Sequence, residues 1–568
     1  MSTYLIRSLY ITLYQKIQKL KDISKNHRLL LAILVIISCF VLFFDLGGRG
    51  FQNKDYLRFA ETAREMMFTG DYIVPHYAGK IYLAKPPLLM WTITLSSQIG
   101  GIITPFTARI PSALCALLSI ITVFLFGKHL YKNPMAGFWA GLILLSNYMF
   151  FLYSRTVKTD MMLATFIFTA LYTFYMGYTS DTQKRRIYFV LFYVSIALAI
   201  LTKGPLGFII PLIIIFIYLL CKKELVLFKH MHWLMGLGIL GLMVGPWVIL
   251  MCQKIGLNTV INNAFSESVV RYGTEEYGHK QPFYFFLPEL IKGFLPYSIF
   301  FPATCVYLFS KKVERNAGDR WWLSIWFIII FIIMSISRCK SARYILPLYP
   351  ALALMMGGMW TSISRTEGKN VCLNKWIKYT LVIALVIILM LSVGFPVYAF
   401  THYPKLFPVG VGIGILFTVG IAGKLFIKRF RGYDISFSII IAFFTIIALV
   451  YMKELSTYNY RHSPGLDLAN TVSQHVKRNE LYYYKVPDEC LSPMNFYMNR
   501  LIPEIKNEKN LSAAFLTNNT VYCIAGKKAY EEKNSFQNVS HTVLQNIRYK
   551  DIDLILMVSH LKTDQAEW

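Results

Sequence analysis

Residues 53–87 read NKDYLRFAETAREMMFTGDYIVPHYAGKIYLAKPP, and this polar stretch closely follows the first hydrophobic run of the chain, residues 29–44. Unpaired backbone groups and charges are costly inside a bilayer. A polar stretch between long apolar runs must therefore lie at the membrane surface or face water. The stretch predicts that the chain leaves the membrane after its first crossing and forms a loop outside the hydrocarbon layer.

Residues 54–68 of this loop are predicted to form an amphipathic helix. Asn53 as the N-cap places Asp55 in the first turn, where the helix dipole favours an ionised carboxylate. Gly70 ends the helix, and Lys85-Pro86-Pro87 forces an extended turn. Helical spacing puts Tyr56, Phe59, Ala60, Ala63, Met66 and Met67 on one face, and Asp55, Arg58, Glu61, Thr62 and Glu65 on the other. The simplest interpretation is an interfacial helix that rests on lipid with its charges in water.

The composition is that of a polytopic membrane protein. Of the 568 residues, 55% are hydrophobic and 15% are charged, and the mean hydropathy is +0.47. Apolar runs of about 20 residues are long enough to cross a bilayer. Thirteen spans are predicted, at 29–46, 107–127, 134–152, 157–178, 187–202, 205–220, 232–251, 294–310, 321–336, 343–363, 377–397, 407–426 and 434–452.

Residues 87–102 are apolar but short, and the distribution of charge decides where they lie. If they lie in the interface, the predicted cytoplasmic segments carry 26 Lys and Arg residues and the short outer loops carry 7. The positive-inside rule favours this arrangement. It predicts a cytoplasmic N-terminus, an outer C-terminus, and two long outer loops at 47–106 and 252–293. The first 28 residues show no cleavable signal peptide, so the first span is expected to be a retained anchor.

The net charge of +28 does not indicate nucleic acid, because the basic residues are dispersed along loops between spans. That dispersion is typical of membrane topology and of contact with anionic lipids. The nine cysteines form no C-x-x-C pair and no Cys/His metal spacing. Only Cys490 and Cys523 lie in the final polar segment, where a disulfide is possible.

The chain changes character after residue 452. Strand-like runs at 481–486, 520–525 and 554–558, with a helix-like piece at 493–501, predict a small α/β domain. The predicted division is a transmembrane catalytic domain over 1–452 and an outer C-terminal domain over 453–568.

Cations gather in the loops that this topology places outside. Each could be a side chain that snorkels from a helix end, but several loops supply them to one side. Phosphate is the natural partner, since Arg gives bidentate contacts and Lys gives a point charge. The candidates are Arg58, Lys85, Arg155, Lys158, Lys203, Arg271, Arg338, Lys340 and Arg343.

Two acids, Asp55 and Asp160, lie among these cations, and Arg155 or Lys158 could pair with Asp160. Carboxylates that face lipid phosphates suit glycosyl transfer, because its transition state resembles an oxocarbenium ion and an acceptor hydroxyl can lose a proton to a carboxylate. Tyr82, His279 and Tyr344 are placed nearby, although each is also typical of an interface. The chain has no Walker motif and no G-x-G-x-x-G opening a helix, which points to a lipid-linked donor.

At these residues the chain resembles the bacterial aminoarabinose transferases that modify lipid A, within the protein O-mannosyltransferase-like GT-C glycosyltransferases. The resemblance covers residues 29–360 best. The motifs that carry it are Asp55-Tyr-Leu-Arg58-Phe-Ala-Glu61, Gly70-Asp71-Tyr-Ile-Val-Pro75, Tyr82-Leu-Ala-Lys85-Pro86-Pro87, Ala108-Arg109-Ile-Pro111-Ser112, Arg155-Thr-Val-Lys-Thr-Asp160, Leu201-Thr-Lys203-Gly204 and Lys340-Ser-Ala-Arg343-Tyr344.

The resemblance implies a mostly α, polytopic GT-C fold with interfacial helices in the first outer loop and a small periplasmic α/β domain. It implies a bacterial inner membrane enzyme that uses a sugar on undecaprenyl phosphate and needs no cofactor. Asp55 is the expected catalytic residue, with Asp160 beside it. Lys85 and Arg271 are the expected phosphate ligands, with Arg58, Lys203, Lys340 and Arg343, and the cavity is lined by Tyr82, Glu61, Tyr344, Arg155, Lys158 and His279.

Three positions depart from the family pattern. Tyr56 follows Asp55 where relatives often have Glu, Ala84 precedes the Lys-Pro-Pro motif where they often have an acid, and 267–268 reads Glu-Ser where they often have Glu-His. If the acid and the His hold a metal in relatives, this chain is expected to lack that site. The departures leave the sugar open between aminoarabinose and another amino sugar such as galactosamine.

Three functions compete. The first moves an amino sugar from undecaprenyl phosphate to a lipid A phosphate, an acceptor that is already anionic and needs no general base. The second is a protein O-glycosyltransferase, in which Asp55 would act as the base. The third is a lipid or ion transporter, which the concentration of charges in outer loops rather than at the midplane argues against. The chain is expected to act as a monomer, with membrane lipids as its other partners.

Overall fold

A computed structural model describes residues 26–51, 54–266, 281–309, 320–365, 371–402, 404–426, 433–461, 464–476, 480–515, 520–531, 536 and 540–559. The chain divides into two compact units, one made of residues 1–44 and 112–452 and the other of residues 45–111 and 453–568. We call them unit 1 and unit 2. The boundary after Met452 coincides with the predicted domain boundary. The first outer loop, however, groups with the C-terminal domain rather than with the transmembrane helices.

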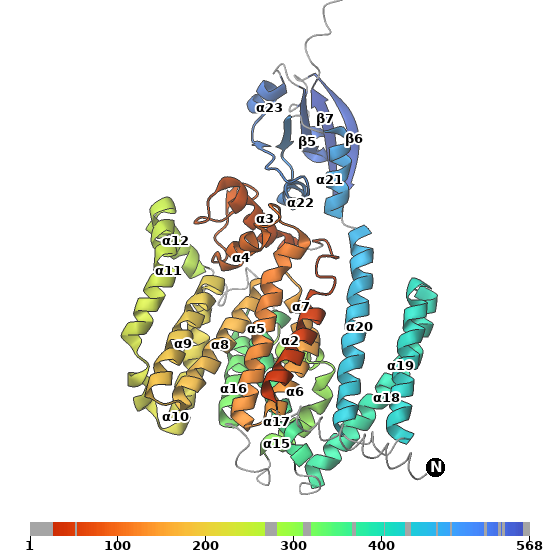
Figure 1. The fold of residues 1–568 in the computed structure, drawn as a ribbon. Helices are drawn as coiled ribbons and strands as arrows, with labels where there is room; N and C mark the ends of the chain where they lie inside the picture. Colours follow the sequence, from red (N-terminus) through yellow and green to blue (C-terminus); the bar gives the residue numbers. More distant parts are fainter. Residues whose placement is uncertain are drawn as a thin grey trace, which may run out of the picture. The chain divides into compact units, whose positions relative to one another are not determined.

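Unit 1 is a bundle of apolar helices (Figure 1). Its α-helices are α2 (His27–Phe43), most of α5 (Pro105–Tyr131), α6 (Pro134–Ser146), α7 (Tyr148–Ser154), α8 (Thr159–Thr179), α9 (Thr182–Lys203), α10 (Leu206–Lys222), α11 (Trp233–Ile255), α12 (Leu257–Phe265), α14 (Phe286–Gly293), α15 (Phe301–Phe309), α16 (Arg320–Ile336), α17 (Tyr349–Arg365), α18 (Val371–His402), α19 (Phe407–Phe426) and most of α20 (Tyr433–Arg461). Short 3-10 segments connect them at η1 (Leu225–His230), η3 (Phe283–Phe285), η4 (Tyr297–Phe300), η5 (Ala342–Leu348) and η6 (Pro404–Leu406).

Within the described residues, seven helices are long and apolar enough to cross a membrane, or nine if each of two bent helix pairs counts as one span. One predicted span, 134–152, is such a pair, in which α6 and α7 meet at 69°. The side chain of Asn147 accepts the Phe150 amide at 3.0 Å and so caps a new helix at the break. The apolar pattern alone could not show this break, because both halves are equally hydrophobic.

Four further apolar helices are 10 to 17 residues long. Three of them, α2, α10 and α16, correspond to predicted spans, so the total of thirteen spans stays a prediction. The fourth, α4 (Leu88–Ser97), covers the doubtful stretch 87–102 and has only 10 residues. At about 1.5 Å per residue it is too short to cross the hydrocarbon layer, which agrees with the interfacial interpretation.

Unit 2 begins with the first outer loop, which folds as α3 (Lys54–Thr69), a small hairpin of β1 (His76–Tyr77) and β2 (Lys80–Ile81), and then α4. The predicted end of α3 is confirmed, since Gly70 has a φ of +72° and its amide bonds to the Met66 carbonyl. The prediction that the polar face of α3 meets water is wrong. Glu61 and Thr62 are fully buried and Glu65 is 1% exposed, because this face packs against the C-terminal part of unit 2.

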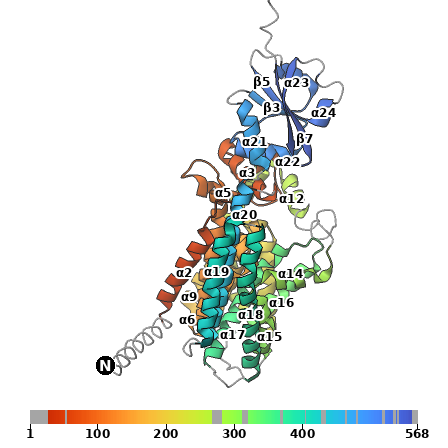
Figure 2. The same cartoon turned by 90° about the vertical axis from the view of Figure 1, so that its right-hand side faces the viewer.

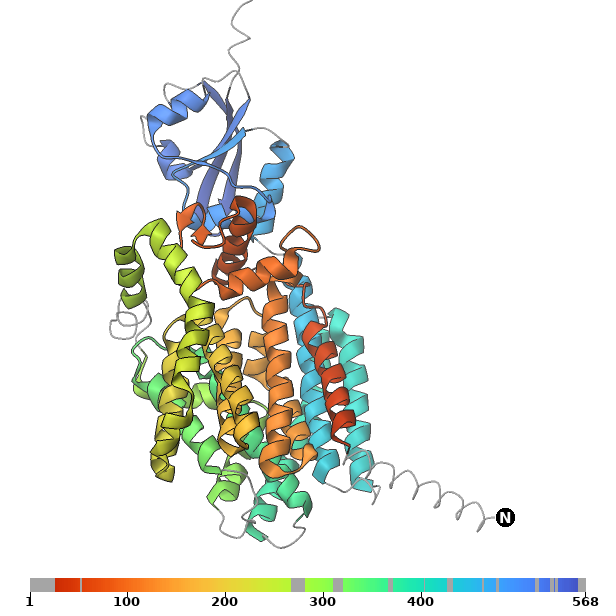
Figure 3. The same cartoon turned by 60° about the vertical axis from the view of Figure 1, so that its left-hand side comes forward.

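The C-terminal part of unit 2 is a five-stranded mixed sheet with helices on both faces (Figures 2 and 3). The strands lie in the order β4 (Glu504–Ile505), β3 (Glu480–Tyr484), β5 (Val521–Gly526), β7 (Ile552–Ser559) and β6 (His541–Tyr549). The helices are α21 (Pro464–His475), α22 (Asp488–Tyr497), α23 (Glu508–Phe515) and α24 (Lys527–Glu531). The predicted α/β class and the three predicted strands are confirmed. The predicted helix begins five residues earlier, as α22.

Cys490 and Cys523 are both free thiols. Each is fully buried, but Cys490 belongs to the core beneath α21 and α22, whereas Cys523 belongs to the core on the α23 side. The possible disulfide between them is therefore ruled out, because the two side chains lie on opposite faces of the sheet.

Candidate functional site

The main polar cluster of unit 1 is built where α8, α9 and η5 meet. Asp160 lies in the first turn of α8, a position where the helix dipole favours a carboxylate. Lys203 lies in the last turn of α9, where the dipole favours a cation. Arg343 and Tyr344 are in the 3-10 segment η5. The start of α8, the end of α9 and the distant segment η5 thus bring their charged side chains to one place.

Asp160 is shared between two cations. Lys203 Nζ lies 2.6 Å from Oδ1 and Arg343 Nε lies 3.1 Å from Oδ2, and the carboxylate is buried. The sequence named Arg155 or Lys158 as the partner of Asp160, and the Lys158 charge does act on the carboxylate. The ion pairs with Lys203 of α9 and Arg343 of η5 were not predicted.

Tyr344 completes this cluster. The Lys203 Nζ lies 4.5 Å from the centre of its ring, and the Arg343 guanidinium carbon lies 5.6 Å from it. Both contacts are cation–π interactions, which fix the direction of the two side chains. One carboxylate among Lys203, Arg343 and Lys158 leaves excess positive charge, so the cluster is suited to an anion such as a phosphate.

Arg155 contacts backbone carbonyls at the end of α2. Its guanidinium donates to the carbonyls of Val41 at 3.1 Å, Leu42 at 2.9 Å and Phe44, all at the C-terminal end of α2. Those carbonyls have no partner within the helix and carry its negative dipole end. We therefore assign Arg155 to the capping of α2 rather than to the lining of a substrate cavity.

Replacing Arg155 with Met is expected to lower the free energy of unfolding by about 2–3 kcal/mol, because several buried carbonyls lose their donor. Arg155→Lys retains a charge with fewer directed donors, so its loss is expected to be smaller. Thermal denaturation of the purified protein in detergent measures both. Equal stability of the intact and Arg155→Met chains would contradict the capping role.

Lys340 is also held by backbone. Its Nζ donates to the Ser337 carbonyl at 2.6 Å and to the Gln281 carbonyl at 3.3 Å. These bonds tie the segment before η5 to the segment that leads into α14. The ammonium is partly exposed, so its predicted contact with phosphate stays a prediction.

A second cluster lies within unit 2, around Arg58 of α3. The guanidinium carbon lies 5.8 Å from the centre of the Tyr77 ring and 5.9 Å from that of Tyr82. Tyr77 is on β1, and Tyr82 follows β2 with its amide bonded to the Pro75 carbonyl at 2.8 Å. Sequence reasoning proposed Arg58 and Tyr82 but missed Tyr77. The hairpin-forming sequence between Arg58 and Tyr82 was the signal that could have identified Tyr77.

The remaining predicted residues are placed as follows. Asp55 lies in the first turn of α3. Lys85 is partly buried, and its ammonium contacts the carbonyl of the preceding Ala84. Glu61 is fully buried against Arg64, so we assign it to the support of α3 rather than to a cavity wall. Arg271 and His279 lie outside the described residues.

Across the described ranges, no three His, Cys, Asp or Glu side chains form a group that could hold a metal ion. The sequence predicts that this chain lacks the acid and the His that relatives often have. That prediction rests on Ala84 and on residues 267–268, and residues 267–268 lie outside the described residues.

Comparison with known proteins gives three findings. The family model of dolichyl-phosphate-mannose-protein mannosyltransferases matches residues 84–249. An uncharacterized protein of Aquifex aeolicus is 29% identical over 345 residues, which are 60% of this chain and 66% of that protein. The undecaprenyl phosphate-alpha-4-amino-4-deoxy-L-arabinose arabinosyl transferase 2 of Proteus mirabilis is 27% identical over 372 residues, which are 65% of this chain and 66% of that protein.

The fold is also that of a solved structure. The crystal structure of ArnT from Cupriavidus metallidurans bound to undecaprenyl phosphate matches with a TM-score of 0.73 at 23% identity. The match covers 92% of this chain and 97% of that one, so it includes the C-terminal domain as well as the helices. The resemblance predicted from the motifs is therefore confirmed: the chain is similar in sequence to aminoarabinose transferases and has the fold of ArnT.

Proposed function

We propose that the chain is a membrane glycosyltransferase that moves an amino sugar from undecaprenyl phosphate to a phosphate of lipid A on the periplasmic face. The observation that carries the proposal is the Asp160 cluster. Lys203 and Arg343 share one buried carboxylate and retain excess positive charge beside Tyr344. The named relatives support the choice of donor and of sugar.

In the proposed reaction, an oxygen of the lipid A phosphate attacks the anomeric carbon of the sugar as the bond from that carbon to the undecaprenyl phosphate oxygen breaks. The leaving phosphate keeps the electron pair of the broken bond, and nearby cations stabilise its charge. The acceptor phosphate is already ionised, so no proton has to be removed from it. Asp55 is proposed to balance the positive charge that develops on the sugar ring.

A protein O-glycosyltransferase is the second candidate, favoured by the family model over residues 84–249. There the acceptor is a hydroxyl group, and Asp55 would take its proton. A phosphate acceptor predicts no such requirement for a base.

The test is a transfer assay with the purified full chain in liposomes. Undecaprenyl phosphate aminoarabinose is the donor, lipid A is the acceptor, and product is identified by its mass. We expect lipid A to gain one pentosamine per modified phosphate. Intact donor and unmodified lipid A after incubation with folded protein would overturn the proposal, and transfer to a supplied acceptor polypeptide instead would favour the second candidate.

A further inference from the structure

We propose that the C-terminal domain is a positioning element of the transferase, which holds through Arg64 the helix and hairpin that present Asp55, Arg58, Tyr82 and Lys85. The proposal rests on the proposed function for the roles of those four residues. The geometry behind it lies entirely within unit 2, where the first outer loop and the C-terminal domain form one compact body.

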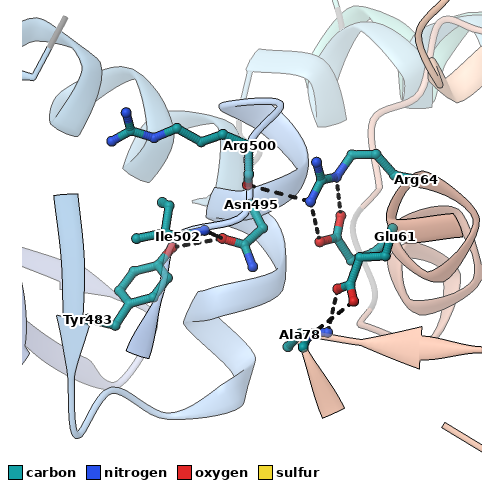
Figure 4. Close-up of polar contacts among 9 residues, drawn as sticks. Glu61, Arg64, Ala78, Tyr483, Asn495, Arg500 and Ile502 are labelled. Carbon is teal, nitrogen blue, oxygen red and sulfur yellow. Dashed lines mark hydrogen bonds and ion pairs between the residues drawn. The ribbon is translucent and has the colours of Figure 1, made fainter. Parts of the chain in front are cut away.

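The residue of α3 that contacts the C-terminal domain, Arg64, belongs to a buried ion pair. Arg64 donates from Nε and Nη2 to the two carboxylate oxygens of Glu61, at 2.8 and 2.9 Å, and the same Nη2 reaches the Arg500 carbonyl at 3.4 Å (Figure 4). Glu61 is fully buried and Arg64 is 5% exposed. A bidentate pair of this kind fixes direction as well as distance. It therefore holds the guanidinium on α3 in the direction from which Nη2 reaches the Arg500 carbonyl of the C-terminal domain.

The accepting carbonyl is itself held in place. The side chain of Asn495 on α22 accepts the Ile502 amide at 3.2 Å (Figure 4). The backbone carbonyl of Asn495 accepts the Arg500 amide at 3.1 Å. These bonds close the turn after α22, in which Asn499 has a φ of +49°. The turn therefore holds the Arg500 carbonyl in place for Arg64. It belongs to the C-terminal domain rather than to the first outer loop.

The next acid on α3 holds the hairpin. Glu65 accepts the Ala78 amide at 2.6 Å and the Gly79 amide at 3.2 Å, one on each carboxylate oxygen. Ala78 and Gly79 have φ of +53° and +74°, which makes this two-residue turn unfavourable for alanine. The carboxylate offsets that cost with two charge-assisted bonds. It thereby fixes the strands that lead to Tyr77 and Tyr82.

The hairpin also touches the C-terminal domain directly. Ala78 packs against the core beneath α21 and α22, and Tyr77 shares a hydrogen bond with Ser492 of α22. At the start of the loop, the Phe51 amide donates to the Tyr497 hydroxyl at 3.2 Å, and the Phe51 ring meets Phe496 edge-on at 5.0 Å. Phe51, which precedes α3, and the hairpin, which follows it, are thus both anchored to α22 of the C-terminal domain.

The protonation of Glu61 decides whether the protein can fold without the Arg64 guanidinium. Burial raises the pKa of Glu61 to about 7, and the Arg64 charge opposes that rise. Without the guanidinium, Glu61 would take up a proton rather than remain as a buried charge. Arg64→Gln is therefore expected to fold, while its link to the Arg500 carbonyl becomes weaker.

The experiment compares Arg64→Gln with Arg500→Gln in the full chain. Arg500→Gln keeps the accepting carbonyl and changes only a side chain whose buried Nε and Nη2 have no hydrogen-bond partner among the described residues. We expect kcat to fall roughly ten- to hundredfold in Arg64→Gln, as misplaced reacting groups do, and to stay within about twofold in the control. Hydrogen exchange of the backbone at 54–82 should be faster in Arg64→Gln alone.

A second variant acts on the hairpin. Glu65→Gln keeps the shape of the side chain but one of its two acceptors becomes a donor, so the KM for the lipid-linked sugar is expected to rise about tenfold or more. The positioning role is overturned if folded Arg64→Gln and Glu65→Gln transfer sugar at the intact rate with unchanged exchange. It is also overturned if neither variant folds, because both residues would then serve the fold alone. Absence of transfer by the intact chain would instead reject the proposed function, since exchange at 54–82 reports the link without any activity.

Discussion

Replacing Asp160 with Asn is expected to reduce both the stability of the protein and its transfer activity, with the larger effect on transfer. The carboxylate is the shared partner of Lys203 and Arg343, at 2.6 and 3.1 Å. Without it, two partly buried cations remain close together and lose the carboxylate that they share. Breaking a buried pair in this way costs about 3–5 kcal/mol, and the partial exposure of both cations places the expected loss near the lower figure.

Transfer is expected to fall by at least about 100-fold in Asp160→Asn, because Lys203 and Arg343 lose the group that fixes their positions relative to Tyr344. The matched control is Glu289→Gln, which breaks the Glu289–Lys292 pair of the same unit, whose lysine is 64% exposed, at a cost of about 1 kcal/mol. Thermal unfolding in detergent and the liposome assay give the two readouts. Stability equal to that of the control would contradict the assigned role of Asp160.

Asp55→Asn is expected to abolish transfer while the protein stays folded. Asp55 lies in the first turn of α3. Its exchange for the neutral amide keeps the shape of the side chain but removes the negative charge proposed to act on the oxocarbenium-like sugar. Loss of a group that acts only in the transition state lowers kcat by roughly 100- to 10,000-fold, with little change in donor binding.

Lys54→Gln is the matched control for Asp55→Asn, since it changes one charge at the neighbouring position of the same helix and has no proposed role. We expect its kcat to remain close to that of the intact chain. The liposome assay with both variants checks the prediction. An active Asp55→Asn chain would remove Asp55 from the mechanism.

The sequence predicts the membrane class, the shortness of α4 and the end of α3 well, because each depends on local composition or on a single residue such as Gly70. It predicts the burial of α3 poorly. A polar face normally indicates water, but here Glu61, Arg64 and Glu65 find partners in a hairpin and in a domain more than 400 residues away. Hydrophobic periodicity contains no information about such a partner.

The same limit applies to the charged cluster of unit 1. The residue types of Asp160, Lys203 and Arg343 and their positions at helix ends were enough to select them. Their pairing was not predictable, because it depends on how α8, α9 and η5 pack. Arg155, five residues before Asp160, instead caps the carbonyls of α2, and so local spacing could not name the ion-paired partners of Asp160.

The most direct test of the proposed function is the mass of lipid A from cells that make the lipid-linked amino sugar donor and express either the intact chain or Asp55→Asn. The account predicts a mass increment of one pentosamine, or of one hexosamine if the donor carries galactosamine, only with the intact chain. Identical lipid A spectra from the two strains, with both proteins present in the membrane, would contradict lipid A as the acceptor.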